Sequence, residues 1–318
     1  METLEGGEIR MLAGIDVGGT KIAVGLVDAS GHVVRREDTP IYVSRGPDEA
    51  TERILAILRR QMEGTGLKVT GVGIGCTGPV DPITGEVGDV NTLPGWQGWK
   101  PCEALSAEMQ VTAAMENDAD AALLGEARVG AGKGARNLIC VTVGTGIGVG
   151  LLIEGRIYRG AGHSHPEIGH HVIEASGPLC SCGAYGCWEA LAAGPAMEQW
   201  FAQESGGQGA LDARAICALA RSGDSTATRA VQRTAGYLGT GLANIISIFM
   251  PETIVLGGSV FDSADLFLPE IRRVVAQNCR LVPHELCAIS LASLGRDLGL
   301  IGAAQVWHHR FGNAEGIA

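Results

Sequence analysis

The sequence lacks three features that define large classes of protein. Its 24 Lys and Arg residues are outnumbered by 35 Asp and Glu residues, which leaves a net charge of −11 and no basic excess for binding nucleic acid. No apolar run approaches the roughly 20 residues of a membrane-spanning helix. The segment Met1–Arg10 is acidic where an export signal would be basic. We therefore expect a cytoplasmic protein whose partners are neither nucleic acids nor membranes.

The chain also lacks a Walker A sequence, because Gly132-Lys133-Gly134 does not have the required spacing. Aromatic residues make up only 4% of the chain, whereas glycine is abundant at 48 residues. At roughly 100 to 200 residues per domain, 318 residues favour about two domains. Nine cysteines in a chain without an export signal favour reduced thiols or metal ligation over disulfides.

Glycine turns follow apolar runs at three places. The runs 11–17, 137–143 and 253–256 are predicted strands, and each ends in a glycine-containing turn. Backbone N–H groups in such turns can form concave sites for anions, so the three turns together predict a nucleotide site. The residues assigned to it are Gly18, Gly19, Thr20, Lys21, Thr145, Gly146, Gly257 and Gly258.

The first two turns resemble each other. When residue 16 is set against residue 142, Val17 aligns with Val143 and Gly18 with Gly144, which suggests two similar α/β halves; a chance recurrence is the alternative. Asp16 ends the first strand, where its carboxylate could hold Mg²⁺ directly or through water. The alternative is an aspartate that hydrogen-bonds its own turn.

The segment 163–189 concentrates potential metal ligands. It holds four histidines, three glutamates and the cysteines Cys180, Cys182 and Cys187. Sulfur donors with a nearby imidazole are the usual ligands of four-coordinate Zn²⁺. A structural zinc knuckle unrelated to substrate is the alternative. Further along, Asp118 precedes the Ala-rich run 119–129 and is predicted to cap that helix.

Five motifs in this order resemble the ROK family of bacterial sugar kinases and repressors, and they span nearly the whole chain. They are Leu12 to Lys21, Glu116-Asn117-Asp118, Val143 to Gly146, Glu167-x-Gly169-His170, and Cys180-x-Cys182-Gly183-x-x-Gly186-Cys187-x-Glu189. The resemblance implies an α/β, two-lobed, actin-like (ribonuclease-H-like) fold in which ATP and a hexose meet. We expect the smaller lobe to comprise 1–117 with about 298–318, and the larger lobe 118–297.

The resemblance also implies residue roles. Asp118 would be the base that accepts the proton of the sugar hydroxyl as it attacks the γ-phosphate of ATP. The residues that would contact the sugar are Asn117, Glu167, His170, Glu189 and Gly78. The zinc ligands would be His170, Cys180, Cys182 and Cys187, so His170 could bind structural Zn²⁺ through one ring nitrogen and face the sugar with the other.

The sugar itself is less well defined than the reaction. His165-Pro166-Glu167 resembles the fructokinase branch of the family, whereas the cysteine spacing resembles the glucokinase branch. We expect phosphorylation of glucose at its 6-hydroxyl, with fructose, mannose or an N-acetylhexosamine as alternatives. A sugar-sensing repressor is a remote alternative, because such proteins carry a helix-turn-helix module ahead of the first glycine turn, which here begins at residue 16. The family also suggests a homodimer or homotetramer.

Overall fold

The computed structural model describes residues 9–207 and 211–312. Packing divides the chain into two compact units: unit 1 comprises the chain up to Leu138, Gly150–Pro166 and the chain from Ala292, and unit 2 comprises Ile139–Val149 and Glu167–Leu291. No helix in the described ranges is both long and apolar enough to span a membrane.

Unit 1 is built on a mixed five-stranded sheet with the order β3-β2-β1-β4-β7. The strands are β1 (Ile9–Val17), β2 (Lys21–Val27), β3 (Val33–Pro40), β4 (Leu67–Cys76) and β7 (Ala113–Asn117). The first three pair antiparallel, while β1, β4 and β7 run parallel. A short hairpin of β5 (Val80–Asp81) and β6 (Glu86–Val87) follows β4.

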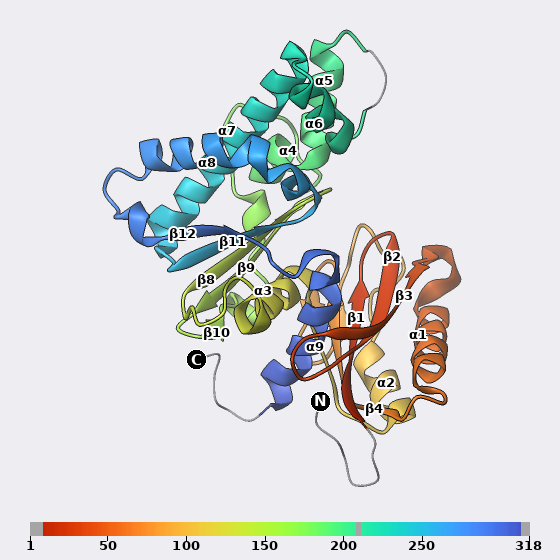
Figure 1. The fold of residues 1–318 in the computed structure, drawn as a ribbon. Coiled ribbons are helices and arrows are strands. Elements are labelled where there is room, and N and C mark those ends of the chain that lie inside the picture. Colours follow the sequence, from red (N-terminus) through yellow and green to blue (C-terminus); the bar gives the residue numbers. More distant parts are fainter. Residues whose placement is uncertain (1–8, 208–210, 313–318) are drawn as a thin grey trace. The chain divides into compact units, whose positions relative to one another are not determined.

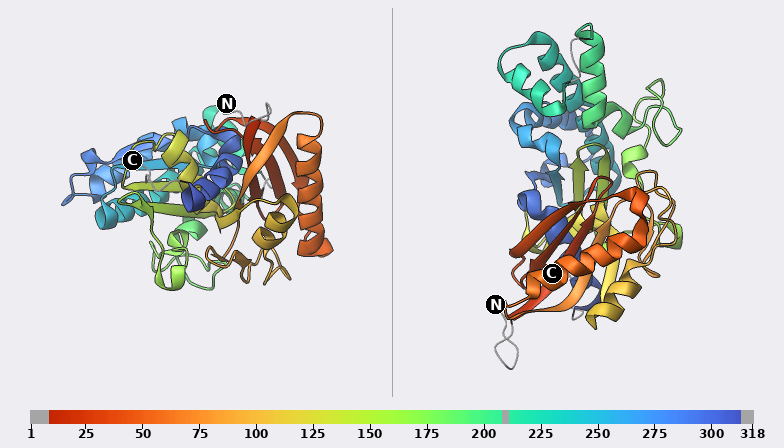
Figure 2. Two further views of the ribbon diagram at one scale, coloured as in Figure 1. Left: turned by 90° about the horizontal axis from the view of Figure 1, so that it is seen from below. Right: turned by 90° about the vertical axis from the view of Figure 1, so that its right-hand side faces the viewer.

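Helices cover both faces of this sheet (Figures 1 and 2). The helices are α1 (Gly46–Met62), α2 (Pro101–Met109), α3 (Asp118–Val129) and α9 (Leu298–Phe311). α1 packs on β2 and α2 on β4 and β7, whereas α9 and α3 pack together on the other face. The α1 side holds a buried apolar core that includes Ile15, Ile54 and Trp96.

Glycines bring α9 unusually close to the sheet. A Cβ at Gly14 of β1 would lie 2.2 Å from the carbonyl oxygen of Leu300, and one at Gly73 of β4 would lie 1.8 Å from that of Ala303. Because any side chain at these positions would push the helix away, the glycine-rich strands determine where the N-terminus of α9 meets the sheet.

The second sheet repeats the chain order of the first. Its order is β10-β9-β8-β11-β12, from β8 (Leu138–Val143), β9 (Ile147–Ile153), β10 (Arg156–Ile157), β11 (Thr253–Gly257) and β12 (Ala288–Leu291). In each sheet, the strand that comes first in the chain has the next two strands of the chain on one side. On its other side lie the strands that come later in the chain. This correspondence supports the two similar halves predicted from the aligned turns.

The helices of unit 2 are α4 (Trp188–Ala192), α5 (Gly194–Glu204), α6 (Ala213–Arg221), α7 (Ser225–Phe249) and α8 (Ala264–Asn278). α7 packs along α8 and also contacts α4, α5 and α6 (Figure 1). Trp188 is fully buried there, and its ring fits against Gly241 of α7, where a Cβ would lie 2.2 Å from the ring.

Two details differ from the sequence predictions. The N-cap of α3 is Asn117 rather than Asp118, because the Asn117 Oδ1 atom accepts the Ala119 N–H at 2.8 Å. The sequence also predicts a single helix over 190–204, whereas the structure has two, because Ala193 is extended before Gly194-Pro195 starts α5. The predicted lobes, 1–117 with about 298–318 and 118–297, and the actin-like assignment stay predictions.

Candidate functional site

The ends of three parallel strands place the predicted residues of unit 1 along one edge of its sheet. Asp16 of β1 is in register with Gly75 of β4, and Gly75 with Glu116 of β7. One residue further on, Val17, Cys76 and Asn117 are in register. The carboxyl edge of a parallel sheet is where α/β proteins bind ligands.

The Asp16 carboxylate lies against the first turn of α9. A Cβ at Gly299 would be only 2.2 Å from Asp16 Oδ2, so glycine is required there for the carboxylate to occupy this position. Burial raises the pKa of Asp16, while the nearby Lys21 and Arg36 oppose that rise. A carboxylate oxygen of this kind is a suitable ligand for Mg²⁺ or its water shell.

The turn after Asp16 is held by its own backbone. The Gly18 N–H donates to the Lys21 carbonyl at 3.0 Å. Gly19 fits closely against the Thr92 side chain, where a Cβ would lie 2.9 Å away, and Thr20 is exposed. The Lys21 ammonium forms an exposed ion pair with Asp38 at 2.9 Å, so this predicted phosphate ligand has a protein partner in the structure.

Asn117 and Asp118 lie at the junction of β7 and α3. The Asn117 amide both caps α3 and donates to the carbonyl oxygen of Gly78 at 3.1 Å. Gly78 has a φ of +87°, and a Cβ there would lie 2.3 Å from Val90, so the position requires glycine. Asp118 Oδ1 accepts the Ala119 N–H at 2.8 Å, and the residue is half-buried in the first turn of α3. Capping and tethering therefore fix the chain that carries Asp118.

Two contacts between an acidic and a basic side chain lie on either side of this junction. Arg159 donates to the Glu116 carboxylate, and burial raises the pKa of Glu116 to about 7 even though Arg159 opposes the rise. His165 Nδ1 lies 2.9 Å from Asp120 Oδ2. The sequence analysis did not identify either pair, because the partners are far apart in the chain.

In unit 2, a carboxylate occupies the glycine turn between β8 and β9. Glu189 Oε2 accepts the Ile147 N–H at 3.0 Å, and a Cβ at Gly146 would lie 2.5 Å from the same oxygen. Glu189 is half-buried in the first turn of α4, where the helix dipole favours negative charge. The second turn thus receives its carboxylate from a helix.

Other glycines meet at the same turn. The Gly194 N–H at the start of α5 donates to the Gly144 carbonyl at 2.8 Å. Gly258, with a φ of +91°, follows the buried Gly257 and approaches Val143 so closely that a Cβ would lie 2.3 Å from its carbonyl oxygen. Thr145 at the tip is exposed. Two of the three predicted nucleotide turns therefore come together within unit 2, and Gly194, which the sequence analysis missed, joins them.

A cavity of about 250 Å³ opens beside the Gly258 turn. Its lining comes from α5, α6 and the residues after β11, namely Met197, Ala213, Arg214, Cys217, Arg221, Ser259, Val260, Asp262 and Ser263. Arg214 pairs with Asp262 at 3.1 Å, and Arg221 pairs with Asp265 at 2.6 Å. The cavity thus combines an apolar floor with a charged rim.

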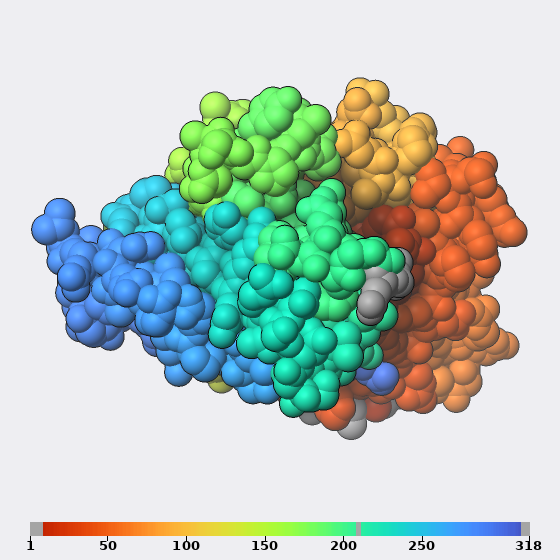
Figure 3. Space-filling view, turned by 90° about the horizontal axis from the view of Figure 1, so that it is seen from above, coloured from red at the N-terminus to blue at the C-terminus, as the bar shows by residue number. Residues whose placement is uncertain are grey.

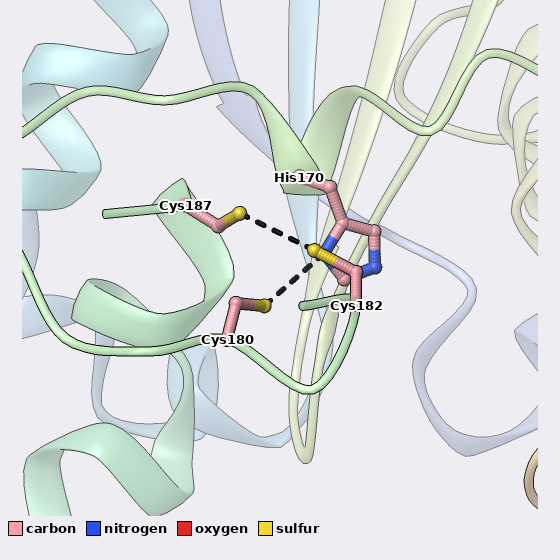
Figure 4. A group of neighbouring side chains, drawn as sticks. All are labelled: His170, Cys180, Cys182 and Cys187. Atoms are coloured by element: carbon pink, nitrogen blue, oxygen red, sulfur yellow. Dashed lines mark hydrogen bonds between the residues drawn. The ribbon is translucent and has the colours of Figure 1, made fainter. Parts of the chain in front are cut away.

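The predicted metal ligands form one group. The ligand atoms of His170, Cys180, Cys182 and Cys187 all lie within 4.8 Å of one another (Figure 4). His170 Nδ1 is 3.4 Å from Cys180 Sγ, and the Sγ atoms of Cys182 and Cys187 are 3.6 Å apart. A tetrahedral zinc ion with Zn–S bonds of about 2.3 Å separates its sulfurs by about 3.8 Å, so this Cys₃His group fits zinc in donor chemistry and in size.

The Cys₃His group lies close in the chain to residues that the sequence predicts to contact the sugar. His170 ends the short helix η3 (Ile168–His170), which Glu167 precedes, and Cys187 is the N-cap of α4, two residues before Glu189. Glu167 is exposed. Cys182 and the residues 183–185 are also exposed. The light-green part of the chain, to which they belong, stands out from the surface in the space-filling view (Figure 3). The neighbouring His171 is not a member, because its Nδ1 donates to the Ile168 carbonyl at 2.6 Å.

Comparison with known structures first defines the class of fold. The ROK family glucokinase from Streptomyces griseus, solved with glucose and AMPPNP, superposes with a TM-score of 0.81 at 31% identity, covering 94% of this chain and 99% of that one. The protein is thus an α/β protein with mixed sheets and the fold of a ROK glucokinase structure, which confirms the predicted α/β class.

The sequence comparison then gives the family. A ROK family profile matches residues 12–310, and the chain belongs to the ROK family, as the motifs predicted. The glucokinase of Streptomyces coelicolor is 33% identical over 92% of this chain and 96% of its own length. The xylose repressor of Bacillus subtilis is 30% identical over 92% of this chain but over 76% of its own length.

Proposed function

We propose that this protein is an ATP-dependent hexose kinase that transfers the γ-phosphate to the 6-hydroxyl of glucose. The observation that carries the proposal is Asp118, a half-buried carboxylate whose helix start is fixed by the Asn117 cap. The carboxylate accepts the hydroxyl proton as the sugar oxygen forms its bond to phosphorus and the bond to ADP breaks. Phosphoryl transfer needs mainly such positioning and charge stabilisation.

The glycine turns would hold the phosphates of ATP. The Gly18 N–H closes the first turn by donating to the Lys21 carbonyl, so the donors offered to the phosphates would be the backbone N–H groups at Gly19, Thr145 and Gly146. Lys21 would exchange its exposed Asp38 partner for a phosphate. Mg²⁺ supplies charge neutralisation when bound, and Asp16 would hold it. The cavity beside Gly257-Gly258 has the apolar floor that an adenosine requires, with arginines at its rim.

The sugar contacts would come from Glu167, His170 and Glu189 together with Asn117 and Gly78. A polyol is recognised by carboxylates that each accept from hydroxyl groups. His170 has its Nδ1 directed at the thiols, which leaves Nε2 as the ring atom for a sugar hydroxyl. Zinc in the Cys₃His group would fix the imidazole and the start of α4, which carries Glu189.

Replacing Asp118 with Asn tests the proposed base. The amide keeps the size and the oxygen that accepts the Ala119 N–H, but it cannot take a proton from the substrate, so kcat should fall by at least about 100-fold. Asp48 offers a matched control, since it is an exposed acid in the first turn of α1. Asp48→Asn should leave kcat unchanged. An Asp118→Asn enzyme with full activity would refute the assignment.

A panel of glucose, fructose, mannose and N-acetylhexosamines tests the substrate. The highest kcat/KM should belong to glucose; a higher value for another sugar would keep the reaction and correct the specificity. The repressor alternative has one supporting observation, the similarity to the xylose repressor. Specific DNA binding in a gel-shift assay, without turnover of any sugar, would favour it.

A further inference from the structure

A short segment of unit 1 is held at both ends by side chains that contact acidic residues. It runs from Arg159 to His165, between β10 and η3. Arg159 donates to Glu116 at its start, and His165 Nδ1 is 2.9 Å from Asp120 Oδ2 at its end. Because an ionised carboxylate can only accept, Nδ1 is the donor in the second pair.

The second pair is almost completely buried. The side chains of His165 and Asp120 are 7% and 2% exposed. Asp120 Oδ1 is buried and has no hydrogen-bond partner within the described ranges, so the carboxylate depends strongly on His165. Two well-packed apolar side chains would often be at least as stable as such a pair. Removing only one partner would leave the other buried without compensation, so the two residues act as a unit.

The two acids follow one another along the chain in the same order as their two basic partners. Glu116 and Asp120 lie on either side of Asn117-Asp118, at the end of β7 and in the first turn of α3. His165 is followed directly by Pro166 and Glu167. The contact between His165 and Asp120 thus connects the first turn of α3, which carries Asp118, to the chain two residues before Glu167.

We propose that His165, through its pair with Asp120, is a positioning residue that sets the orientation of Asp118 and the placement of Glu167. The inference rests on the proposed kinase function. The sequence associated His165 with the choice of sugar, but the buried imidazole faces Asp120, so it acts on the sugar through the residues it holds. Arg159 and Glu116 hold the other end of the same segment.

The test compares four variants of the full-length protein with the wild type, using ATP·Mg²⁺ and the preferred sugar. His165→Leu removes the donor, and His165→Asn restores an N–H near the position of Nδ1. The double variant His165→Leu/Asp120→Leu removes the imidazole and the carboxylate together, so no lone buried carboxylate remains as it does in His165→Leu, and we expect it to fold. His163→Asn is the control, because His163 is exposed and has a φ of +64° that Asn tolerates.

We expect kcat per folded molecule to fall about 10- to 100-fold in His165→Leu and in the double variant, because small displacements of a reacting group cost about that much. KM for the sugar should rise in both. His165→Asn should recover most of kcat, and His163→Asn should match the wild type. Amide hydrogen exchange at residues 117–120 should be faster in the double variant, a readout that does not depend on turnover.

Three results decide the matter. A folded double variant with wild-type kcat and KM would overturn the inference and leave the pair a structural contact, whatever its melting temperature. Failure of His165→Asn to exceed His165→Leu would also overturn it. If the wild type phosphorylates no sugar in the panel, the proposed function fails first, and this inference fails with it; the wild-type assay therefore separates the two cases.

Discussion

The two glycine turns of the molecule present a carboxylate in different ways. The turn after β1 is preceded by its own acid, Asp16, whereas the equivalent position before the second turn is Thr142. That second turn is filled instead by Glu189, which reaches Ile147 from the start of α4. In both cases a glycine makes room for the carboxylate: Gly299 for Asp16, and Gly146 for Glu189.

The difference concerns what holds each acid in place. Asp16 is positioned by the sheet and by α9, which pack together in unit 1. Glu189 is positioned by a five-residue helix whose N-cap, Cys187, belongs to the Cys₃His group. Duplicated hairpins can therefore serve different ligands, because one acid depends only on packing while the other would depend on a metal.

Among variants that distinguish the two turns, the largest effect should come from Asp16→Asn. If Asp16 holds Mg²⁺, kcat with ATP·Mg²⁺ should fall about 10- to 100-fold or more, with little change in sugar KM. Asp28→Asn is the control, because Asp28 accepts the N–H groups of Ser30 and His32 within its own turn, the role that was the alternative for Asp16. Equal activity of both variants would assign Asp16 the same turn role.

The same variant has a predicted effect on stability. Burial raises the pKa of Asp16, so the native state binds this proton more tightly than the unfolded chain. The free energy of unfolding should then decrease as pH rises from the unfolded pKa to the raised native one. Asp16→Asn removes this decrease, so its melting temperature at pH 7 should equal or exceed that of the wild type. A clear loss of thermal stability would contradict the sign.

Removing zinc should affect the second turn and leave the first intact. Chelation, or Cys187→Ser, should raise the sugar KM about 10-fold and lower the melting temperature, while KM for ATP changes little. Cys102→Ser is the matched control, since Cys102 is half-buried in unit 1 outside the group. Metal analysis of freshly purified protein should find one zinc per chain; its absence would refute the zinc site.

The smallest effects should come from adding one methyl group at each supporting glycine. Gly299→Ala should displace the Asp16 carboxylate, and Gly146→Ala the Glu189 carboxylate, because each Cβ would overlap the acid. A several-fold loss is expected, in kcat with ATP·Mg²⁺ for the first and in sugar KM for the second. Gly236→Ala in α7 is the control, because nothing lies within 4 Å of the new Cβ there. Gly134 also has open space around it, but its φ of +88° would add backbone strain. If both variants changed kcat and the sugar KM in the same way, the two turns would not serve different ligands.

Local patterns predicted much of this molecule. The strand ends at Val17 and Val143 follow from the apolar runs and the turn residues after them. The Cys-x-Cys spacing predicted a metal-type group, and the structure brings its three thiols and His170 together. The break at Ala193 was missed because apolar spacing continues through it, although Gly194-Pro195 was a usable signal.

The order of the glycine turns, the Cys/His spacing and the acids at strand ends are properties of short stretches, and the sequence alone determined them together with the family. Tertiary structure decided which acid fills which turn, and that His165 and Arg159 pair with Asp120 and Glu116 across more than forty residues. The physical reason is that a buried charged group pairs with whichever group tertiary packing brings near it. The spacing of residues along the sequence does not predict that partner.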